Sequence, residues 1–269
     1  MCNLTQQNYD LDWYCKAPTT HGITCQDWKM ALGDKNTYVS KTDMEFIITY
    51  QHRELQQTLE LQVEGVNELI SLNDTSCHMW PKEDSWNTHP SGFYYKGRWQ
   101  NVRCKITNNV PIPRYKRCFA NRQLLLIGDS NVRIIGTRII NEMEFRLLKG
   151  NATSSIPQDI LAYDKNNNIT LSMFPHQLPY YAHRFVDKTV FVSAAKRLDD
   201  IPAGDNRIIL IHLWLHMLRS SVDTFRYHVR HIRQAIERLI QRSPNVHISI
   251  KGPHAYNYKD QLPVDYMAS

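Results

Sequence analysis

The segment from residue 123 to residue 135 constrains the fold more than any other part of the chain. It reads Gln-Leu-Leu-Leu-Ile-Gly-Asp-Ser-Asn-Val-Arg-Ile-Ile. The run at 123–127 is apolar on both faces, which predicts a strand buried in a parallel sheet. A helix is expected to follow at 132–142. Gly128 permits a tight turn between the two, and this turn would present Ser130 at the mouth of an α/β domain.

The rest of the C-terminal half alternates between strand and helix signals. Apolar or alternating runs predict further strands at 169–174, 189–192, 207–213 and 246–250. The clearest helix is expected at 222–242, before Pro244. Its apolar stripe consists of Phe225, Val229, Ile232, Ile236, Leu239 and Ile240. This order predicts an α/β fold with an open, mostly parallel sheet and flanking helices.

The cysteines all precede the strand at 123. They are Cys2, Cys15, Cys25, Cys77, Cys104 and Cys118. This segregation predicts a disulfide-stapled N-terminal section, although the sequence does not choose among the many pairings. The glycosylation candidates are Asn3, Asn73, Asn151 and Asn168, each in an Asn-x-Thr sequon. We therefore expect a protein that is secreted or lies in the lumen of the secretory pathway, such as the Golgi, although residues 1–5 do not resemble a signal peptide.

We expect the chain to fold as two structural parts. Residues 1–118 would form a cysteine-rich section of irregular and β structure that packs on the core, and residues 119–269 the α/β domain. Residues 77–118 look like an ordered loop region rich in aromatic side chains, and 44–72 like either strand or helix. Residues 151–168 look like a polar loop rather than a site.

The net charge of +6 arises mostly between residues 219 and 242. A basic helix face is usually just solvated, and the interleaved aromatic platforms of single-strand nucleic-acid binders are missing. We therefore expect no nucleic-acid partner. No stretch approaches the ~18 consecutive apolar residues of a membrane span, so membrane contact is expected only through segments that this chain lacks.

Polar residues follow three of the predicted strands. In an open α/β sheet, ligands bind beyond the carboxyl ends of the strands, so these residues would converge on one rim if the strands are neighbours. They are Gly128, Asp129, Ser130 and Asn131 after the first strand, His212, Trp214 and His216 after the second, and Lys251, Gly252 and His254 after the third.

Ser130 is the strongest nucleophile candidate. The start of the following helix offers backbone N–H groups that can stabilise an oxyanion, but a serine hydroxyl also needs a base that takes its proton. Asp129 is expected to point away from Ser130 and to fix the loop. The competing interpretation is that Asp129 or Ser130 simply caps the helix.

The histidines allow two interpretations. His212 and His216 are four residues apart and would share one face of a strand, which suggests a metal pair, but no third ligand is evident and we expect no metal site. We predict that His212 packs in the sheet and that His216 lines the rim. His228 and His231 lie on the basic helix and are expected to be solvated.

Several segments resemble the neurexophilin and PC-esterase domain (NXPE) family. The residues at 125–130 with Arg133 resemble its Gly-Asp-Ser-Thr-x-Arg block, with Asn131 in place of Thr. Residues 91–95, followed by Trp99 and Cys104, resemble a Gly-Tyr-Tyr…Trp element, and 211–216 an apolar strand that ends in Trp-x-His. Residues 232–251 are similar to the family's Ile-Arg…Leu-x-Arg-x-Pro…Ile-Lys run. Residues 2–25 are similar to its cysteine-rich lead-in.

This resemblance implies an SGNH/GDSL-hydrolase-like domain with Ser130 as the acyl-accepting nucleophile. Gly128, Asn131, Arg133, Trp214 and His216 would serve the oxyanion or substrate, and Asp129 would support the loop. The family's Asp-x-x-His-like block is expected further on, but the chain contains no Asp-x-x-His. We therefore expect a chain truncated at its C-terminal end, with weak or no activity of its own.

The function expected from the resemblance is a glycan O-acyl esterase or O-acetyltransferase. No resident cofactor would be required, although a transferase would use acetyl-CoA or another acyl donor. The partner would be a glycan or glycoprotein substrate. The alternative is a secreted or lumenal binding module of neurexophilin-like type, which has kept the fold without the chemistry.

Overall fold

The computed structural model describes residues 1–8, 10–11, 13–32, 76, 79, 92–95, 98–101, 104, 110–178, 185–213, 216–217 and 222–252. The predictions made for 44–72, Asn73, Cys77, Trp214 and His254 lie outside these residues. The chain divides into two compact units: one comprises Met1–Arg53 and Lys116–Ser269, and the other Glu54–Tyr115. The predicted division at residue 118 stays a prediction.

A six-stranded sheet forms the centre of the first unit, in the order β12-β11-β6-β9-β8-β7. Its strands are β6 (Gln123–Gly128), β7 (Arg146–Lys149), β8 (Ile160–Asp164), β9 (Ile169–Pro175), β11 (Ile208–His212) and β12 (His247–Ile250). The four strands from β12 to β9 pair in parallel, whereas β8 and β7 are antiparallel additions. The α/β fold with a mostly parallel sheet is therefore confirmed.

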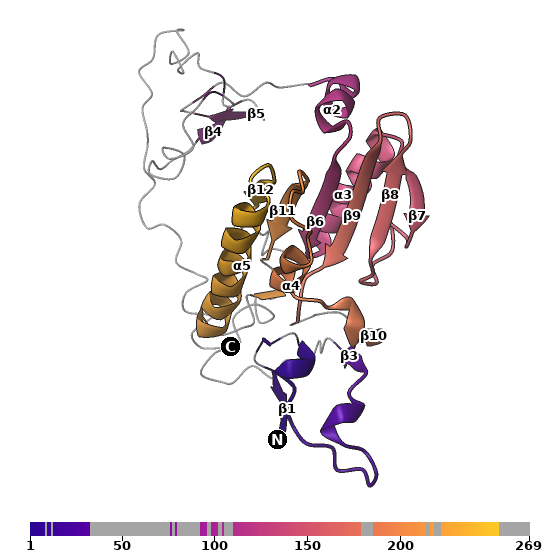
Figure 1. Cartoon of the computed structure of the whole chain (residues 1–269). Helices are drawn as coiled ribbons and strands as arrows, with labels where there is room; N and C mark the ends of the chain where they lie inside the picture. The colour runs from indigo at the N-terminus through magenta and orange to yellow at the C-terminus, as the bar shows by residue number, and fades with distance from the viewer. Residues whose placement is uncertain are drawn as a thin grey trace, which may run out of the picture. The chain divides into compact units, whose positions relative to one another are not determined.

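Helices cover both faces of this sheet (Figure 1). Helices α4 (Ala194–Asp199) and α5 (Val222–Arg242) pack on the face that carries Leu125, Ile127 and Ile209. Helix α3 (Ser130–Glu142) lies on the opposite face, where Gly136 lets it approach Met173 so closely that an added Cβ atom would overlap the methionine sulfur. Burial of β6 from both sides explains its uninterrupted apolar run.

Helix α5 has the predicted bounds but a different buried face. Its buried side chains are His228, Ile232, Ala235 and Leu239. Val229 and Ile240, which were assigned to the apolar stripe, are exposed. The prediction of a solvated His228 is wrong, because the helix turns this residue toward the protein interior.

Three loop or strand predictions differ from the structure. The stretch 151–168 contains β8, which pairs with β9. The candidate strand at 189–192 is replaced at its start by the 3-10 helix η5 (Lys188–Val190), because Asp187 accepts hydrogen bonds from the N–H and hydroxyl of Thr189. The region 77–118 contains helix α2 (Ile112–Phe119) and, in the second unit, the hairpin of β4 (Gly92–Tyr95) and β5 (Arg98–Asn101).

The N-terminal residues form short elements around a disulfide. Cys2 and Cys25 are bonded to each other, which confirms a crosslink in this section. The elements are β1 (Cys2–Asn3), η1 (Gln6–Asn8), β2 (Tyr14–Cys15), η2 (Cys25–Asp27) and β3 (Met30–Leu32). Strand β3 pairs with β10 (Phe185–Asp187) and so ties this section to the C-terminal half. Cys104 is also disulfide-bonded, whereas Cys118 is free and exposed, contrary to the prediction for it.

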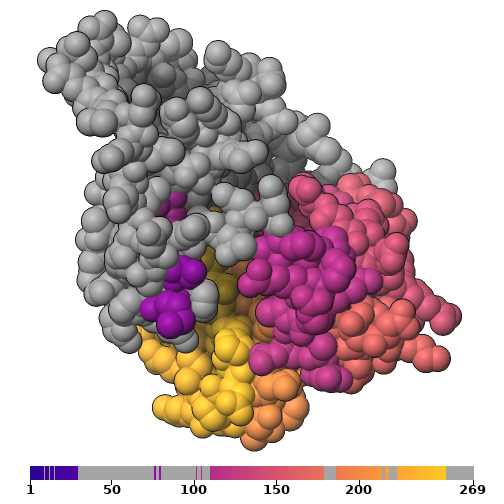
Figure 2. Space-filling model, turned by 90° about the horizontal axis from the view of Figure 1, so that it is seen from above, coloured from indigo at the N-terminus to yellow at the C-terminus, as the bar shows by residue number. Residues whose placement is uncertain are grey.

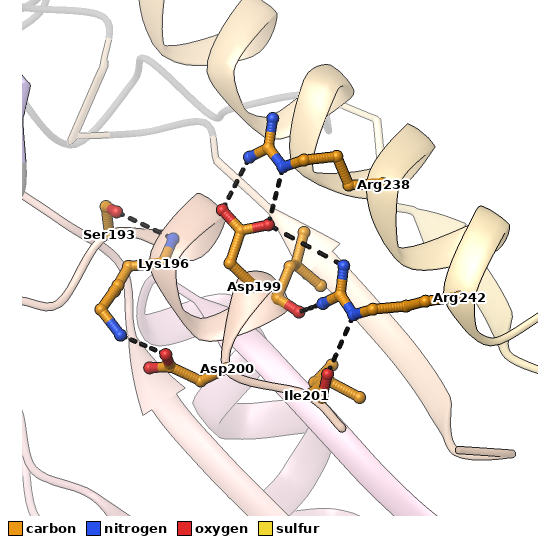
Figure 3. Close-up of polar contacts among 8 residues, drawn as sticks. Ser193, Lys196, Asp199, Asp200, Ile201, Arg238 and Arg242 are labelled. Carbon is orange, nitrogen blue, oxygen red and sulfur yellow. Dashed lines mark hydrogen bonds and ion pairs between the residues drawn. The ribbon is translucent and has the colours of Figure 1, made fainter. Parts of the chain in front are cut away.

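Arginines of α5 tie this helix to α4 (Figure 3). Arg238 donates two hydrogen bonds to the carboxylate of Asp199, at 3.0 and 2.6 Å. Arg242 donates to the backbone oxygens of Leu198 and Ile201, just where α4 ends. In Figure 2 the yellow surface, which belongs to α5 and β12, lies beside the orange surface of the segment around α4 and β11.

Candidate active site

The turn between β6 and α3 is built by two residues with separate tasks. Gly128 lies where a Cβ atom would stand 2.5 Å from the backbone oxygen of His212 and 2.6 Å from Cγ2 of Val132, so a larger residue does not fit. Asp129 is the N-cap of α3, and its Oδ1 accepts hydrogen bonds from the N–H of Asn131 at 2.8 Å and from its side-chain amide at 3.1 Å. Ser130 is therefore the first residue of the helix.

Asp129 is buried beside a histidine of the neighbouring strand. Oδ2 of Asp129 lies 3.7 Å from Nε2 of His212, and both side chains are fully buried. Burial opposes ionisation of Asp129, but the Asn131 N–H, His212 and His176 together lower the pKa of Asp129 below its ordinary value. His212 is in turn held by the backbone oxygen of Lys251, 2.9 Å from its Nδ1. Asp129 thus holds the turn through its hydrogen bond with the N–H of Asn131.

The end of β9 adds a histidine that the sequence analysis missed. Register places Pro175 beside Gly128, and the N–H of His176 donates to the backbone oxygen of Gly128. The signal for it was local, because the polar residues His176 and Gln177 come directly after the predicted strand at 169–174. The sequence alone did not show that β9 lies next to β6 in the sheet.

His176 pairs with His216, which follows β11. Nε2 of His176 lies 2.8 Å from Nδ1 of His216, and the two rings meet edge to face. Nδ1 of His176 contacts the backbone oxygen of Gln177. Burial, followed by the nearby His216, lowers the pKa of His176 to about 3. His176 is therefore neutral at ordinary pH.

Gln177 anchors this pair to the helical layer. Its Oε1 accepts a hydrogen bond from the N–H of Ala194 at the start of α4, and its Nε2 lies 3.0 Å from Nδ1 of His228 on α5. Burial, with His176 and His231 nearby, lowers the pKa of His228 to about 4. The lone pair of a neutral His228 can thus accept the amide proton of Gln177.

Ser130 and the histidine pair line one cavity of about 210 Å³. Gly128, Asp129 and Arg133 also line it, the last from the first turn of α3. The apolar part of its wall consists of Val132, Pro157, Ile160, Met173, Phe174, Pro175 and Phe191. Two of these come from 151–168, so this stretch contributes to the candidate site. The hydroxyl of Ser130 makes no hydrogen bond to any residue that the structure describes.

The other predicted site residues lie elsewhere or act through their backbone. Asn131 does not line the cavity, and its N–H is already bonded to Asp129. Lys251 contributes a carbonyl oxygen to His212, and Gly252 is exposed. Within the described parts of the chain, no group of three or more His, Cys, Asp or Glu side chains is placed to hold a metal ion.

These features define an α/β protein whose candidate active site lies beyond the carboxyl ends of three neighbouring parallel strands. The family model described as NXPE family member 4-like, C-terminal domain, matches residues 99–268. The chain therefore belongs to the NXPE family. No solved structure matches it. Among the described helices, none has the length and apolar character that crossing a membrane requires.

Proposed function

We propose that the protein transfers or hydrolyses acyl esters of glycans, with Ser130 as the nucleophile. The observation that carries the proposal is the placement of Ser130 at the N-terminus of α3, in the same cavity as the His176–His216 pair. A serine, a nearby imidazole and free helix N–H groups are what acyl transfer requires. A helix cap alone does not account for two histidines from neighbouring strand ends.

The reaction proceeds in two halves. In the first, Ser130 Oγ attacks the ester carbonyl while a histidine of the pair accepts its proton. In the second, water or an acceptor hydroxyl releases the acyl group, which distinguishes an esterase from a transferase. The N–H groups of the first helical turn lack carbonyl partners within the helix. The N–H of Asn131 is bonded to Asp129, which makes the N–H of Ser130 the best-placed donor to the oxyanion.

The substrate and the compartment follow from the same proposal. The acceptor or ester is a glycan or glycoprotein, and acetyl-CoA or another activated acyl group serves as the donor if the reaction is a transfer. The protein would work in the secretory lumen or outside the cell, where the Cys2–Cys25 disulfide persists. Asn151 and Asn168 are exposed on this unit and would carry N-glycans there.

A serine-directed acylating probe tests the nucleophile. We expect a fluorophosphonate to label the folded full chain and Ser130→Ala to abolish the label. Ser155→Ala is the matched control, because it removes the other serine of the cavity wall and should leave labelling intact. Labelled peptides are identified by mass spectrometry, and circular dichroism checks that each variant is folded.

Labelling that survives Ser130→Ala would contradict the proposal. A well-folded protein that is not labelled at all would favour the binding module instead. In that case Ser130→Ala should leave binding to a glycan or protein partner unchanged.

A further inference from the structure

The cavity that contains Ser130 has walls of two kinds. Its polar wall includes the serine turn, Arg133 and the two paired histidines, whereas its apolar wall comes from α3, β8, β9 and the residues next to these strands. Four side chains of the apolar wall are almost fully buried: Val132, Ile160, Met173 and Phe191. A group that occupies this side of the cavity must itself be apolar, because a hydroxyl placed there loses its hydrogen bonds to water.

The apolar wall is continuous with the packing of the domain. Ile160 on β8 and Met173 on β9 are register partners in the antiparallel pair, so their side chains lie on the same face of the sheet. Met173 also lies against α3 at Gly136. This side of the cavity therefore borders the apolar layer between α3 and the two strands.

The cavity is larger than an acetyl group needs. Beyond its carbonyl carbon, an acetyl group carries a single methyl. If each methylene takes about the 30 Å³ that a water molecule occupies in the liquid, a cavity of about 210 Å³ has room for several further carbons. Each methylene that moves from water to an apolar wall contributes favourably to binding.

We propose that the apolar side of this cavity is an acyl subsite, which accepts saturated chains of about four to eight carbons. Its wall consists of Val132, Pro157, Ile160, Met173, Phe174, Pro175 and Phe191. Sugar hydroxyls need hydrogen-bond partners, so the glycan part of the ester belongs on the polar side, with Arg133 and Gln158. This inference rests on the proposed serine chemistry and deepens it, because it identifies the class of acyl group.

Charged groups behind the acyl subsite hold its wall in place. The guanidinium group of Arg197 on α4 lies over the ring of Phe174, 3.8 Å from the ring centroid. Arg197 also pairs with Asp159 at 3.1 Å, directly before Ile160. These contacts connect the end of β9 and the start of β8 to α4. A preformed wall binds a chain without first having to be ordered.

The acyl chain stays in the subsite through both halves of the reaction. Ser130 Oγ bonds to the ester carbonyl carbon, the bond from this carbon to the alcohol oxygen breaks, and the serine proton leaves with the alcohol. Water or an acceptor hydroxyl then takes the acyl group, and its proton restores the serine hydroxyl. Because the first half determines kcat/KM, chain length should change kcat/KM even when the leaving group is constant.

A series of p-nitrophenyl esters tests the subsite with the full chain. For each ester, kcat/KM is divided by the rate constant for hydrolysis by hydroxide, which corrects for intrinsic reactivity. We expect a gain of about threefold to fourfold per methylene, hence roughly tenfold for butyrate and roughly 100-fold for hexanoate relative to acetate. The gain should end near about eight carbons, where the cavity is full.

Two substitutions of neighbouring residues show where the chain lies. Pro157→Phe adds a ring to the wall of the acyl subsite and should lower the hexanoate-to-acetate ratio of kcat/KM by about tenfold. Ile156→Phe is the matched control, because Ile156 is exposed and does not line the cavity. This control should keep the ratio of the wild type.

A second measurement does not depend on the serine. NMR of the methyl-labelled methionines is recorded on the full chain with Ser130→Ala, and the resonance that is missing after Met173→Leu belongs to Met173. Hexanoate, the acid released from the hexanoyl ester, should shift this resonance. Acetate at the same concentration should not.

Normalised kcat/KM values that stay equal or fall from acetate to hexanoate overturn the inference. Equal ratios in Pro157→Phe and Ile156→Phe do so as well, because the chain then binds elsewhere. Failure of the wild-type serine to react with the fluorophosphonate overturns the proposed function instead. In that case the Met173 resonance decides the acyl subsite by itself: a shift with hexanoate supports it, and no shift overturns it.

Discussion

Single residues at the centre of this site are fixed by the backbone that surrounds them. Gly128 is flanked by His212 on β11 and Pro175 on β9, and its own oxygen accepts the N–H of His176. No side chain fits between β6 and the carbonyl oxygen of His212. The absence of a side chain at this position therefore brings the serine turn close to both other strand ends.

Gly128→Ala should destabilise the protein by about 1–3 kcal/mol, because the added methyl group overlaps backbone that cannot move without parting β6 from β11. Urea denaturation measures the change in the free energy of unfolding. Gly252→Ala is the control, since a Cβ atom there meets nothing within 4 Å, and it should be close to neutral. Equal effects of the two substitutions would contradict this account.

At the scale of elements, α5 supplies hydrogen-bond donors to the C-terminal end of α4. The last carbonyls of a helix have no partners within it. Arg242 supplies donors to the oxygens of Leu198 and Ile201 and is largely covered, whereas Arg238 meets Asp199 in a half-exposed ion pair. The two arginines of the same helix should therefore contribute unequally.

Arg242→Met should cost about 2 kcal/mol of the free energy of unfolding, since two buried carbonyl oxygens lose a charged donor. Arg238→Met should cost less than about 1 kcal/mol, because solvent screens the exposed pair. Chemical denaturation of both variants gives the comparison. A larger loss for Arg238→Met than for Arg242→Met would refute the ranking.

At the scale of the whole molecule, the sheet and the helical layer enclose neutral histidines. Burial lowers the pKa of His228 to about 4 and that of His176 to about 3. Their ordinary value in an unfolded chain is near 6.5. Between these values the unfolded state binds protons that the folded state excludes, so stability rises with pH through this window. The contribution is complete above about pH 6.5 and is lost as the pH falls toward 4.

We expect the free energy of unfolding to fall by roughly 3 kcal/mol for His228 alone between about pH 7 and about pH 4. His228→Gln keeps a partner for Gln177 and should flatten the pH dependence in this interval. Denaturation curves at stepped pH values provide the test, with His247→Gln as the exposed control. An unchanged slope in His228→Gln would show that His228 is not held neutral.

The sequence by itself predicted the elements whose signals are local. The strand at β6, the helix α5 and the turn that places Ser130 could be read because apolar periodicity, Gly128 and the Asp129 cap act within a few residues. The antiparallel β8 was not predicted, because the polar residues of 151–168 concealed a short strand that is stabilised by its neighbour.

The tertiary structure decided which of these elements meet. Only the strand order showed that the end of β9 lies beside β6 and so brings His176 to the nucleophile turn. Only packing showed that α5 turns His228 inward toward Gln177. The physical reason is that periodicity and caps are set by neighbours along the chain, whereas strand order, burial and histidine protonation are set by neighbours that are distant in sequence. The places of Ser130 and His216 at the sheet edge could therefore be predicted, but the contact between His216 and His176 could not.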